Sequence, residues 1–118
     1  MTGVSLVERV CSYNKAISDP NRMKIIKIVG SQGSNAMNVS AIANVLGISQ
    51  PATTNHLKIM ESVGLLTRER VGNSVYYALN HEAVADYQEL MLHAFAHCAT
   101  PCDYGFQCET CPVKETCM

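Results

Sequence analysis

The sequence has no long, uninterrupted apolar run, and this absence argues against a membrane-spanning helix. Its first fifteen residues also lack the continuous apolar centre of a secretory signal, because acidic and basic side chains interrupt them. No internal repeat or low-complexity segment is present. With 118 residues, 47% of them hydrophobic, the chain has the size and composition of one globular unit with a tail. We therefore expect a cytoplasmic protein with no membrane partner.

The chain also has almost no net charge, and the formal value of −1 at first argues against a polyanionic partner. The distribution of charge reverses this expectation. Residues 20–80 carry six basic and two acidic side chains, a net +4. Residues 81–118 carry one basic and six acidic side chains, a net −5. A basic middle can meet phosphates, and an acidic end attracts cations.

Cysteine is present in clear excess. Six cysteines occur in 118 residues, and five of them lie in the last 21. In a reducing cytosol such crowding favours metal or redox chemistry over structural disulfides. The sequence therefore divides into one folded domain, residues 1–98, and a cysteine-rich tail, residues 99–118.

Hydrophobic periodicity predicts a chain that is mostly helical. Capping side chains, prolines and glycines mark the expected ends of the helices. The expected helices cover residues 4–17, 20–30, 39–46, 49–64 and 81–98, and a polar loop covers residues 31–37.

The third and fourth of these helices are short, and a tight turn at Gly47 joins them, which is the pattern of a helix-turn-helix unit. After Gly64 the hydrophobic period changes from helical to alternating, with a turn at Gly72-Asn73 between two alternating runs. The change predicts a β-hairpin directly behind the unit, in the position of a wing. The expected fold class is mainly α with a small β-hairpin, a winged helix-turn-helix.

Three stretches carry a family resemblance: SDPNR at 18–22, ANVLGISQPATTNHL at 43–57, and GLL with YYAL within 64–79. Together they resemble the ArsR/SmtB family of metal-responsive repressors, over about residues 5–98. The resemblance implies a winged helix homodimer, joined through the first and last helices, that binds an operator and leaves it when an inducer binds. Two reading helices about one DNA turn apart imply an inverted repeat in a double-stranded operator.

The helix expected from Ser49 to Gly64 has the side chains of a helix that reads bases. Short hydrogen-bonding groups gather in its N-terminal half, where the helix dipole also favours phosphate. Amide side chains pair with adenine edges, threonine meets thymine methyl groups, and basic side chains suit phosphate. The expected DNA contacts are Gln50, Thr53, Thr54, Asn55, His56, Lys58, Arg68 and Arg70.

The tail spaces its cysteines in a way that suits a soft metal. Cys108 and Cys111 are separated by two residues, so one turn brings both thiolates to one ion, and Pro112 follows as is frequent beside thiolate ligands. Zinc, cadmium, arsenite and an iron-sulfur cluster all want three or four soft ligands, and the choice among them stays open. The candidate ligands are Cys98, Cys102, Cys108, Cys111 and Cys117, with Cys11 and His97 as further candidates.

The metal sites that the resemblance implies are not carried over intact. One uses a cysteine pair on the first helix of the helix-turn-helix unit, where this sequence has Asn38 and Ser40. Another uses carboxylates and histidines on the last helix. A polar stripe there fits that site only in part, and it consists of Asp86, Glu89, His93 and His97. We interpret Asp86 and Glu89 as solvent-facing. Cys11 is either a core or interface residue or a ligand that completes the partner protomer's site.

The expected function is that of a DNA-binding transcriptional repressor, not an enzyme, which leaves its operator when a thiophilic metal, metalloid or iron-sulfur cluster binds the tail. Two alternatives stay open. In the first, the thiols oxidise or take up sulfane sulfur, so that the repressor senses redox state. In the second, Cys108 and Cys111 belong to a small thiol redox or electron-transfer protein, although nothing catalytic surrounds them.

Overall fold

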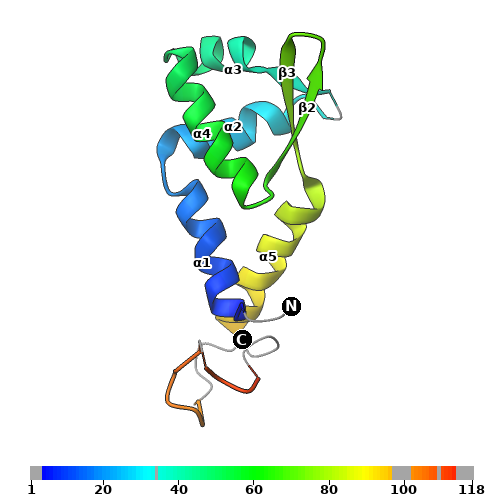
Figure 1. Cartoon of the computed structure of the whole chain (residues 1–118). Coiled ribbons are helices and arrows are strands. Elements are labelled where there is room, and N and C mark those ends of the chain that lie inside the picture. Colours follow the sequence, from blue (N-terminus) through cyan, green and yellow to red (C-terminus); the bar gives the residue numbers. More distant parts are fainter. Residues whose placement is uncertain (1–3, 34, 97–101, 109, 114–118) are drawn as a thin grey trace.

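The computed structural model of the chain describes residues 4–33, 35–96, 102–108 and 110–113. The molecule is elongated, with extents of 52, 28 and 24 Å, and two helical arms run away from a globular head (Figure 1). The arms are α1 (Leu6–Ile17) and α5 (His81–Ala96), and the elements between them form the head. Among the described helices, none combines the length and the apolar character that a membrane crossing requires.

Local capping signals explain where the first two helices begin. α1 starts after Ser5, whose hydroxyl accepts from the Glu8 amide while the Glu8 carboxylate accepts from the Ser5 amide, both at 3.0 Å. This reciprocal pair is a capping box. α2 (Pro20–Gly30) starts after Asp19, whose side chain accepts from an amide of the first turn at 2.8 Å. Pro20 suits the first helical position, because no N–H donor is needed there.

The predicted helix-turn-helix unit is formed by α3 (Val39–Leu46) and α4 (Gln50–Ser62). Gly47 ends α3 with a φ of 72°, in the left-handed region that glycine adopts without steric cost. Ser49 then caps α4, where its hydroxyl accepts from the Ala52 amide at 3.2 Å. Two local signals therefore set the turn between the helices, as the sequence predicts.

The predicted wing is the antiparallel hairpin of β2 (Leu66–Val71) and β3 (Ser74–Leu79). A further short strand, β1 (Met37–Asn38), pairs with the other edge of β3, so that the sheet order is β1-β3-β2. The expectation that Met37 belongs to a loop is wrong. Two residues are too few to show an alternating pattern, and only their partners in β3 make them a strand. With these elements the predicted winged helix-turn-helix fold is confirmed.

Two apolar clusters hold the head together and join it to the arms. The smaller cluster centres on Ala16 of α1, Leu65 and Ala83 of α5, and Ile59 of α4 packs against it. Both arms and α4 therefore contribute side chains to one apolar cluster, so the packing of α4 depends on the arms. The larger cluster joins α2, α3, α4 and the wing through Ile25, Val29, Ile42, Leu57, Met60, Leu66 and Tyr77.

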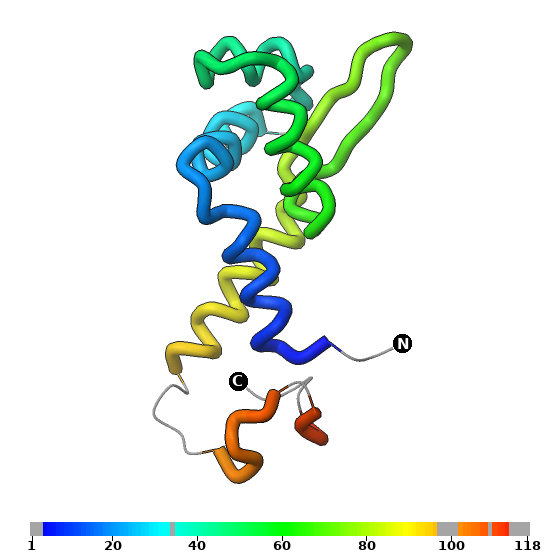
Figure 2. The backbone as a smooth tube through the Cα atoms, turned by 60° about the vertical axis from the view of Figure 1, so that its left-hand side comes forward, coloured from blue at the N-terminus to red at the C-terminus, as the bar shows by residue number. Residues whose placement is uncertain are grey.

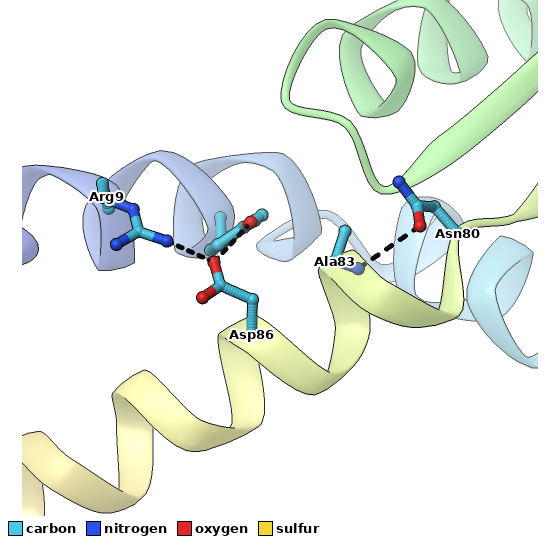
Figure 3. Close-up of polar contacts among 5 residues, drawn as sticks. Arg9, Asn80, Ala83 and Asp86 are labelled. Atoms are coloured by element: carbon cyan, nitrogen blue, oxygen red, sulfur yellow. Dashed lines mark hydrogen bonds and ion pairs between the residues drawn. The ribbon is translucent and has the colours of Figure 1, made fainter.

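Polar contacts join the two arms to each other. Asp86 of α5 accepts from Nη2 of Arg9 at 2.6 Å (Figure 3) and from the hydroxyl of Tyr13 at 2.9 Å, both on α1. Tyr87 donates to Asn14 at 2.6 Å. The interpretation of Asp86 as solvent-facing is therefore wrong, because α1 lies against this side of α5, and a single helix seen alone does not show its neighbour. The other carboxylate of that interpretation, on Glu89, is exposed.

The residue before α5 ties this arm to the head. The Asn80 side-chain oxygen accepts from the Ala83 amide at 3.4 Å (Figure 3), and its Nδ2 donates to the Gly64 carbonyl at 2.9 Å. The Asn80 backbone amide donates to the Leu65 carbonyl at 2.9 Å. The start of α5 is thus fixed to the segment that directly follows α4.

We expect Tyr13→Phe to reduce the loss of stability at high pH. Burial raises the pKa of the Tyr13 hydroxyl above its ordinary value of 10.0, and the hydrogen bond to Asp86 and the charge of that carboxylate raise the pKa further. Such a group contributes stability below its unfolded pKa and loses this contribution as pH rises through its folded pKa. Denaturant unfolding at about pH 8 and about pH 11 measures the loss.

Tyr87→Phe is the matched control, because it removes a hydroxyl between the same helices whose acceptor is the uncharged Asn14 amide. Either variant loses about 1 kcal/mol near neutral pH, the usual contribution of a hydrogen bond. We expect Tyr87→Phe to keep the alkaline loss of the wild type. An alkaline loss of full size in Tyr13→Phe contradicts the role given to this hydroxyl.

Candidate nucleic-acid interface and cysteine-rich tail

α4 has a buried face and an exposed polar face. Leu57 and Met60 are fully buried in the larger cluster. Asn55 and Lys58 lie on the other side of the helix and are exposed. Because α4 is the second helix of the helix-turn-helix unit, this exposed side is the candidate surface for the major groove.

Thr53 does not belong to the exposed side of α4. Its side chain has 0% exposure, and its hydroxyl donates to the Ser49 carbonyl, four residues earlier, at 2.9 Å. The hydroxyl is thus satisfied inside the helix, as a buried polar group requires. The expectation that Thr53 contacts DNA does not fit this position. Its residue type suggested a polar contact, whereas its helical spacing to Leu57 places it on the buried face.

Three other predicted contacts, Gln50, Thr54 and Asn55, have access to solvent, with Thr54 half-buried. Gln50 is the first residue of α4. Its side chain therefore starts at the positive end of the helix dipole, where phosphate is also favoured.

His56 has a partner inside the protein. Nη1 of Arg22, from α2, lies 3.2 Å from Nδ1 of His56. Nε of the same arginine donates to the Ala16 carbonyl, in the last turn of α1, at 2.6 Å. Arg22 and His56 are both half-buried. One of the two ring nitrogens of His56 is therefore engaged within the chain, which sequence reasoning did not foresee.

Asp19 places a negative charge at the same corner of the head. The Asn21 amide, which donates to this side chain, holds the pKa of the carboxyl below its ordinary value of 3.8. The Arg22 amide and the charge of Arg22 act in the same direction, against some desolvation. Asp19 is therefore a carboxylate at neutral pH.

The wing carries two predicted arginines on one face of β2. The register pairs Arg68 with Tyr77 and Arg70 with Val75. In an alternating strand both arginines share the sheet face of Leu66, which packs in the larger cluster. Both are exposed, and Nε of Arg70 donates to the Gly72 carbonyl at 3.2 Å, so Arg70 is held near the turn of the wing. The face of the hairpin that packs on the core at Leu66 is therefore basic toward the turn, where Arg68 and Arg70 are exposed.

The described part of the tail lies beyond the ends of the arms that point away from the head (Figures 1 and 2). Cys102, Cys108 and Cys111 are half-buried there. The Cys111 amide donates to the Cys108 carbonyl at 3.4 Å, so these two residues belong to one turn. Within the described ranges, however, no three His, Cys, Asp or Glu side chains are gathered closely enough to hold a metal ion.

The remaining candidate ligands are placed as follows. Cys98, Cys117 and His97 lie outside the described residues. Cys11 is exposed on α1, so it is not a core residue of the single chain. Asn38, at the position of a family ligand, caps α3 by accepting from the Ala41 amide at 2.8 Å. That position therefore has a structural role.

Large apolar side chains remain exposed on both arms. Leu92 and Phe95 of α5 are 74% and 70% exposed, and Val7 on α1 and Val4 just before it are exposed as well. The sequence predicts an apolar stripe on each arm, and the single chain covers these stripes only in part.

Fold and exposed helix together define a class of protein, the winged helix-turn-helix DNA-binding regulators. A family model described as a helix-turn-helix domain matches residues 17–69. The chain is 35% identical over 79 residues to the transcriptional repressor SdpR of Bacillus subtilis (strain 168), covering 67% of this chain and 84% of that one. It is 31% identical over 88 residues to a cadmium resistance transcriptional regulatory protein, a CadC homolog of Staphylococcus aureus, covering 75% and 69%.

Among solved structures, the homodimeric winged helix-turn-helix domain Mb0332 of Mycobacterium bovis matches with a TM-score of 0.61 and 23% identity. The match covers 82% of this chain and 93% of that one. The chain belongs to the ArsR/SmtB family of transcriptional regulators, as its sequence predicts. Its relatives are DNA-binding regulators and not enzymes.

Proposed function

We propose that the chain is a homodimeric transcriptional repressor that reads its operator with α4 and releases it when a thiophilic metal binds residues 99–118. The observation that carries the DNA-binding part is the exposed polar side of α4, in a head whose wing also presents a basic face. Gln50, Thr54 and Asn55 offer hydrogen-bonding groups to base edges. Lys58, Arg68 and Arg70 offer positive charge to phosphates.

The two arms form the dimer interface in this proposal. Exposed Leu92 and Phe95, with Val4 and Val7 near the same end, are apolar surfaces that a second copy would cover. The homodimeric state of the Mycobacterium bovis domain supports this arrangement. Because two copies present two α4 helices related by a two-fold axis, the operator is an inverted repeat.

We expect Asn55→Ala to lower the affinity for the operator about 5- to 150-fold, because a good amide contact to a base edge contributes about 1–3 kcal/mol. The operator is first selected in vitro from random duplexes, and affinity is then measured by titration of a labelled duplex.

Ser62→Ala is the control, since Ser62 is an exposed residue on the same side of α4, about 10 Å farther along the helix axis. We expect it to bind as the wild type does. Equal affinities of Asn55→Ala and the wild type contradict the proposed reading face.

The tail is the proposed sensing element. Cys108 and Cys111 lie in one turn, and two thiolates of one turn suit chelation of a soft ion. Since no three ligands stand together in the described residues, the site is completed on binding, with further thiolates from Cys102, from Cys98 and Cys117, or from Cys11. The relation to a cadmium resistance regulator supports a soft metal, and zinc, arsenite and an iron-sulfur cluster suit the same donors.

The position of the tail suggests how occupancy reaches DNA. The tail follows α5, which contacts α1 through Asp86 and shares an apolar cluster with Ile59 of α4 through Ala83. Gathering of thiolates at the far ends of the arms shifts the angle between the arms and thereby the two α4 helices. A coupling of about 1–3 kcal/mol lowers DNA affinity about 5- to 150-fold. Thiolate sites bind metal with about 10 kcal/mol or more, which exceeds this requirement.

Elemental analysis and an optical spectrum of protein purified without oxygen test the sensing proposal. Visible absorption indicates an iron-sulfur cluster, and a colourless protein with stoichiometric zinc excludes one. Operator binding with and without the species found then gives the coupling. If no thiophilic metal binds, and an oxidant or sulfane sulfur changes the operator affinity instead, the redox-sensing alternative holds.

A further inference from the structure

We infer that Arg22 is a positioning residue, which fixes the DNA-reading helix α4 to the arm α1 and so sets operator affinity without contacting DNA. The inference rests on the proposed reading of DNA by α4. It concerns how that helix is held, and it assigns a role to a basic residue that the predicted DNA contacts do not include.

The guanidinium of Arg22 bridges two helices other than its own. Its Nε donates to the Ala16 carbonyl of α1 at 2.6 Å, and its Nη1 lies 3.2 Å from Nδ1 of His56 in α4. Arg22 itself belongs to α2. The Arg22 side chain therefore connects its own helix α2 to the end of α1 and to the middle of α4.

The contact with Ala16 has a reason in the sequence. In a continuing helix the Ala16 carbonyl would accept from the amide four residues later, but that residue is Pro20, which has no N–H. Ala16 is 1% exposed, so water has little access to it. The Arg22 guanidinium supplies the donor that the chain itself lacks at this position.

The contact with His56 selects one tautomer of the ring. Arginine has only donors, so Nδ1 of His56 accepts in this contact and the ring N–H is on Nε2. The planar guanidinium offers donors in two directions at fixed angles. Lysine carries the same charge on a flexible stem with one donor group, and it does not reproduce this bridge.

A phosphate contact is the other role open to a basic residue of the head. Arg22 is half-buried, and two of its three nitrogens point at partners within the chain. Asp19 also lies close enough for the charge of Arg22 to lower the pKa of its carboxyl. The guanidinium is thus directed inward, toward His56 and the end of α1, which favours positioning over phosphate binding.

The two roles differ in their response to salt. A phosphate contact releases a counterion, so its loss reduces the slope of log affinity against log salt by about 0.9. Loss of a positioning contact lowers affinity and leaves this slope unchanged. We expect Arg22→Lys and Arg22→Gln each to lower operator affinity about 10-fold at the wild-type slope. Lys58→Gln, at a proposed phosphate contact, reduces the slope and serves as the reference.

His56→Ala keeps the bond from Arg22 to Ala16 and removes the link to α4 together with the ring N–H on Nε2, so it is compared with Arg22→Lys in a double-variant test. We expect an affinity loss similar to that of Arg22→Lys, again at the wild-type salt slope. In the double variant Arg22→Lys, His56→Ala the losses do not add, because both changes break one link. Additive losses assign independent roles to the two side chains and overturn the inference.

Wild-type affinity in Arg22→Lys, or a reduced salt slope in Arg22→Gln, also overturns it. Thermal unfolding of each variant is measured in parallel, so that a global loss of fold is not read as a loss of positioning.

Failure of the proposed function is distinguishable from failure of this inference. If no operator can be selected, or if Asn55→Ala binds like the wild type, the reading by α4 is wrong. If those tests succeed and Arg22→Lys behaves as the wild type, only the positioning role is wrong.

Discussion

Replacing Cys108 and Cys111 together with serine abolishes the response to the metal and leaves operator binding in its absence unchanged. The serine hydroxyl stays protonated near neutral pH and is a hard, weak donor, whereas a soft ion selects thiolate. Sites with a full set of ligands bind zinc with about 10–16 kcal/mol. Loss of two ligands of three or four therefore lowers metal affinity more than about 1,000-fold.

Competition with a chelator of known affinity measures the metal affinity, and operator titration with and without metal measures the response. Thr110→Ala is the matched control, because Thr110 lies between the two cysteines and is exposed, with its hydroxyl donating to the Gln107 carbonyl at 3.4 Å. We expect it to bind metal as the wild type does. A double serine variant that still takes up metal and leaves its operator places the sensing site elsewhere in the chain.

The second large effect is expected in the head, where Leu57→Ala lowers the free energy of unfolding by about 2–5 kcal/mol. Leu57 has 0% exposure, and it packs with side chains of α2, α3 and the wing in the larger cluster. Truncation there removes apolar contact and leaves a cavity. Because domains of this kind are stable by only about 5–15 kcal/mol, this single change removes a large share of the total.

Denaturant unfolding followed by circular dichroism measures this change. Val45→Ala is the control, since it shortens an apolar side chain on the neighbouring helix α3 that is 63% exposed. We expect its effect to stay within about 0.5 kcal/mol. Should Val45→Ala cost as much as Leu57→Ala, the division of the head into a buried and an exposed side is wrong.

Much of the fold can be predicted from the sequence because local capping interactions determine where its helices begin and end. Three of these ends depend on residues only a few positions apart: Asp19 before Pro20, Gly47 in the left-handed region, and Ser49 as a cap. The sequence alone therefore indicates these helix ends. The capping box of Ser5 and Glu8 has the same character. Met37 does not, because its strand exists only through pairing with β3.

The candidate site is predictable to a smaller extent, since several of its residues depend on distant partners. Asp86 looks solvent-facing until α1 is placed against α5, 73 to 77 residues away in the chain. The link between Arg22 and His56 spans 34 residues. The cysteine spacing predicts that two thiols share one turn. The position of a third thiol relative to that turn depends on the path of the tail, which the spacing does not determine.

The distance between tail and head has a consequence for what an effector changes. With a long axis of 52 Å, each protomer of the proposed dimer would rotate about the place where its arms meet those of its partner. A few degrees of rotation at such a pivot leaves each α4 intact, with its own side chains still able to fit a half-site. What is altered is the separation and the relative twist of the two half-sites that the dimer can reach at once. Control of this kind acts through the phasing of the operator along the double helix, and the reading of each individual base is untouched.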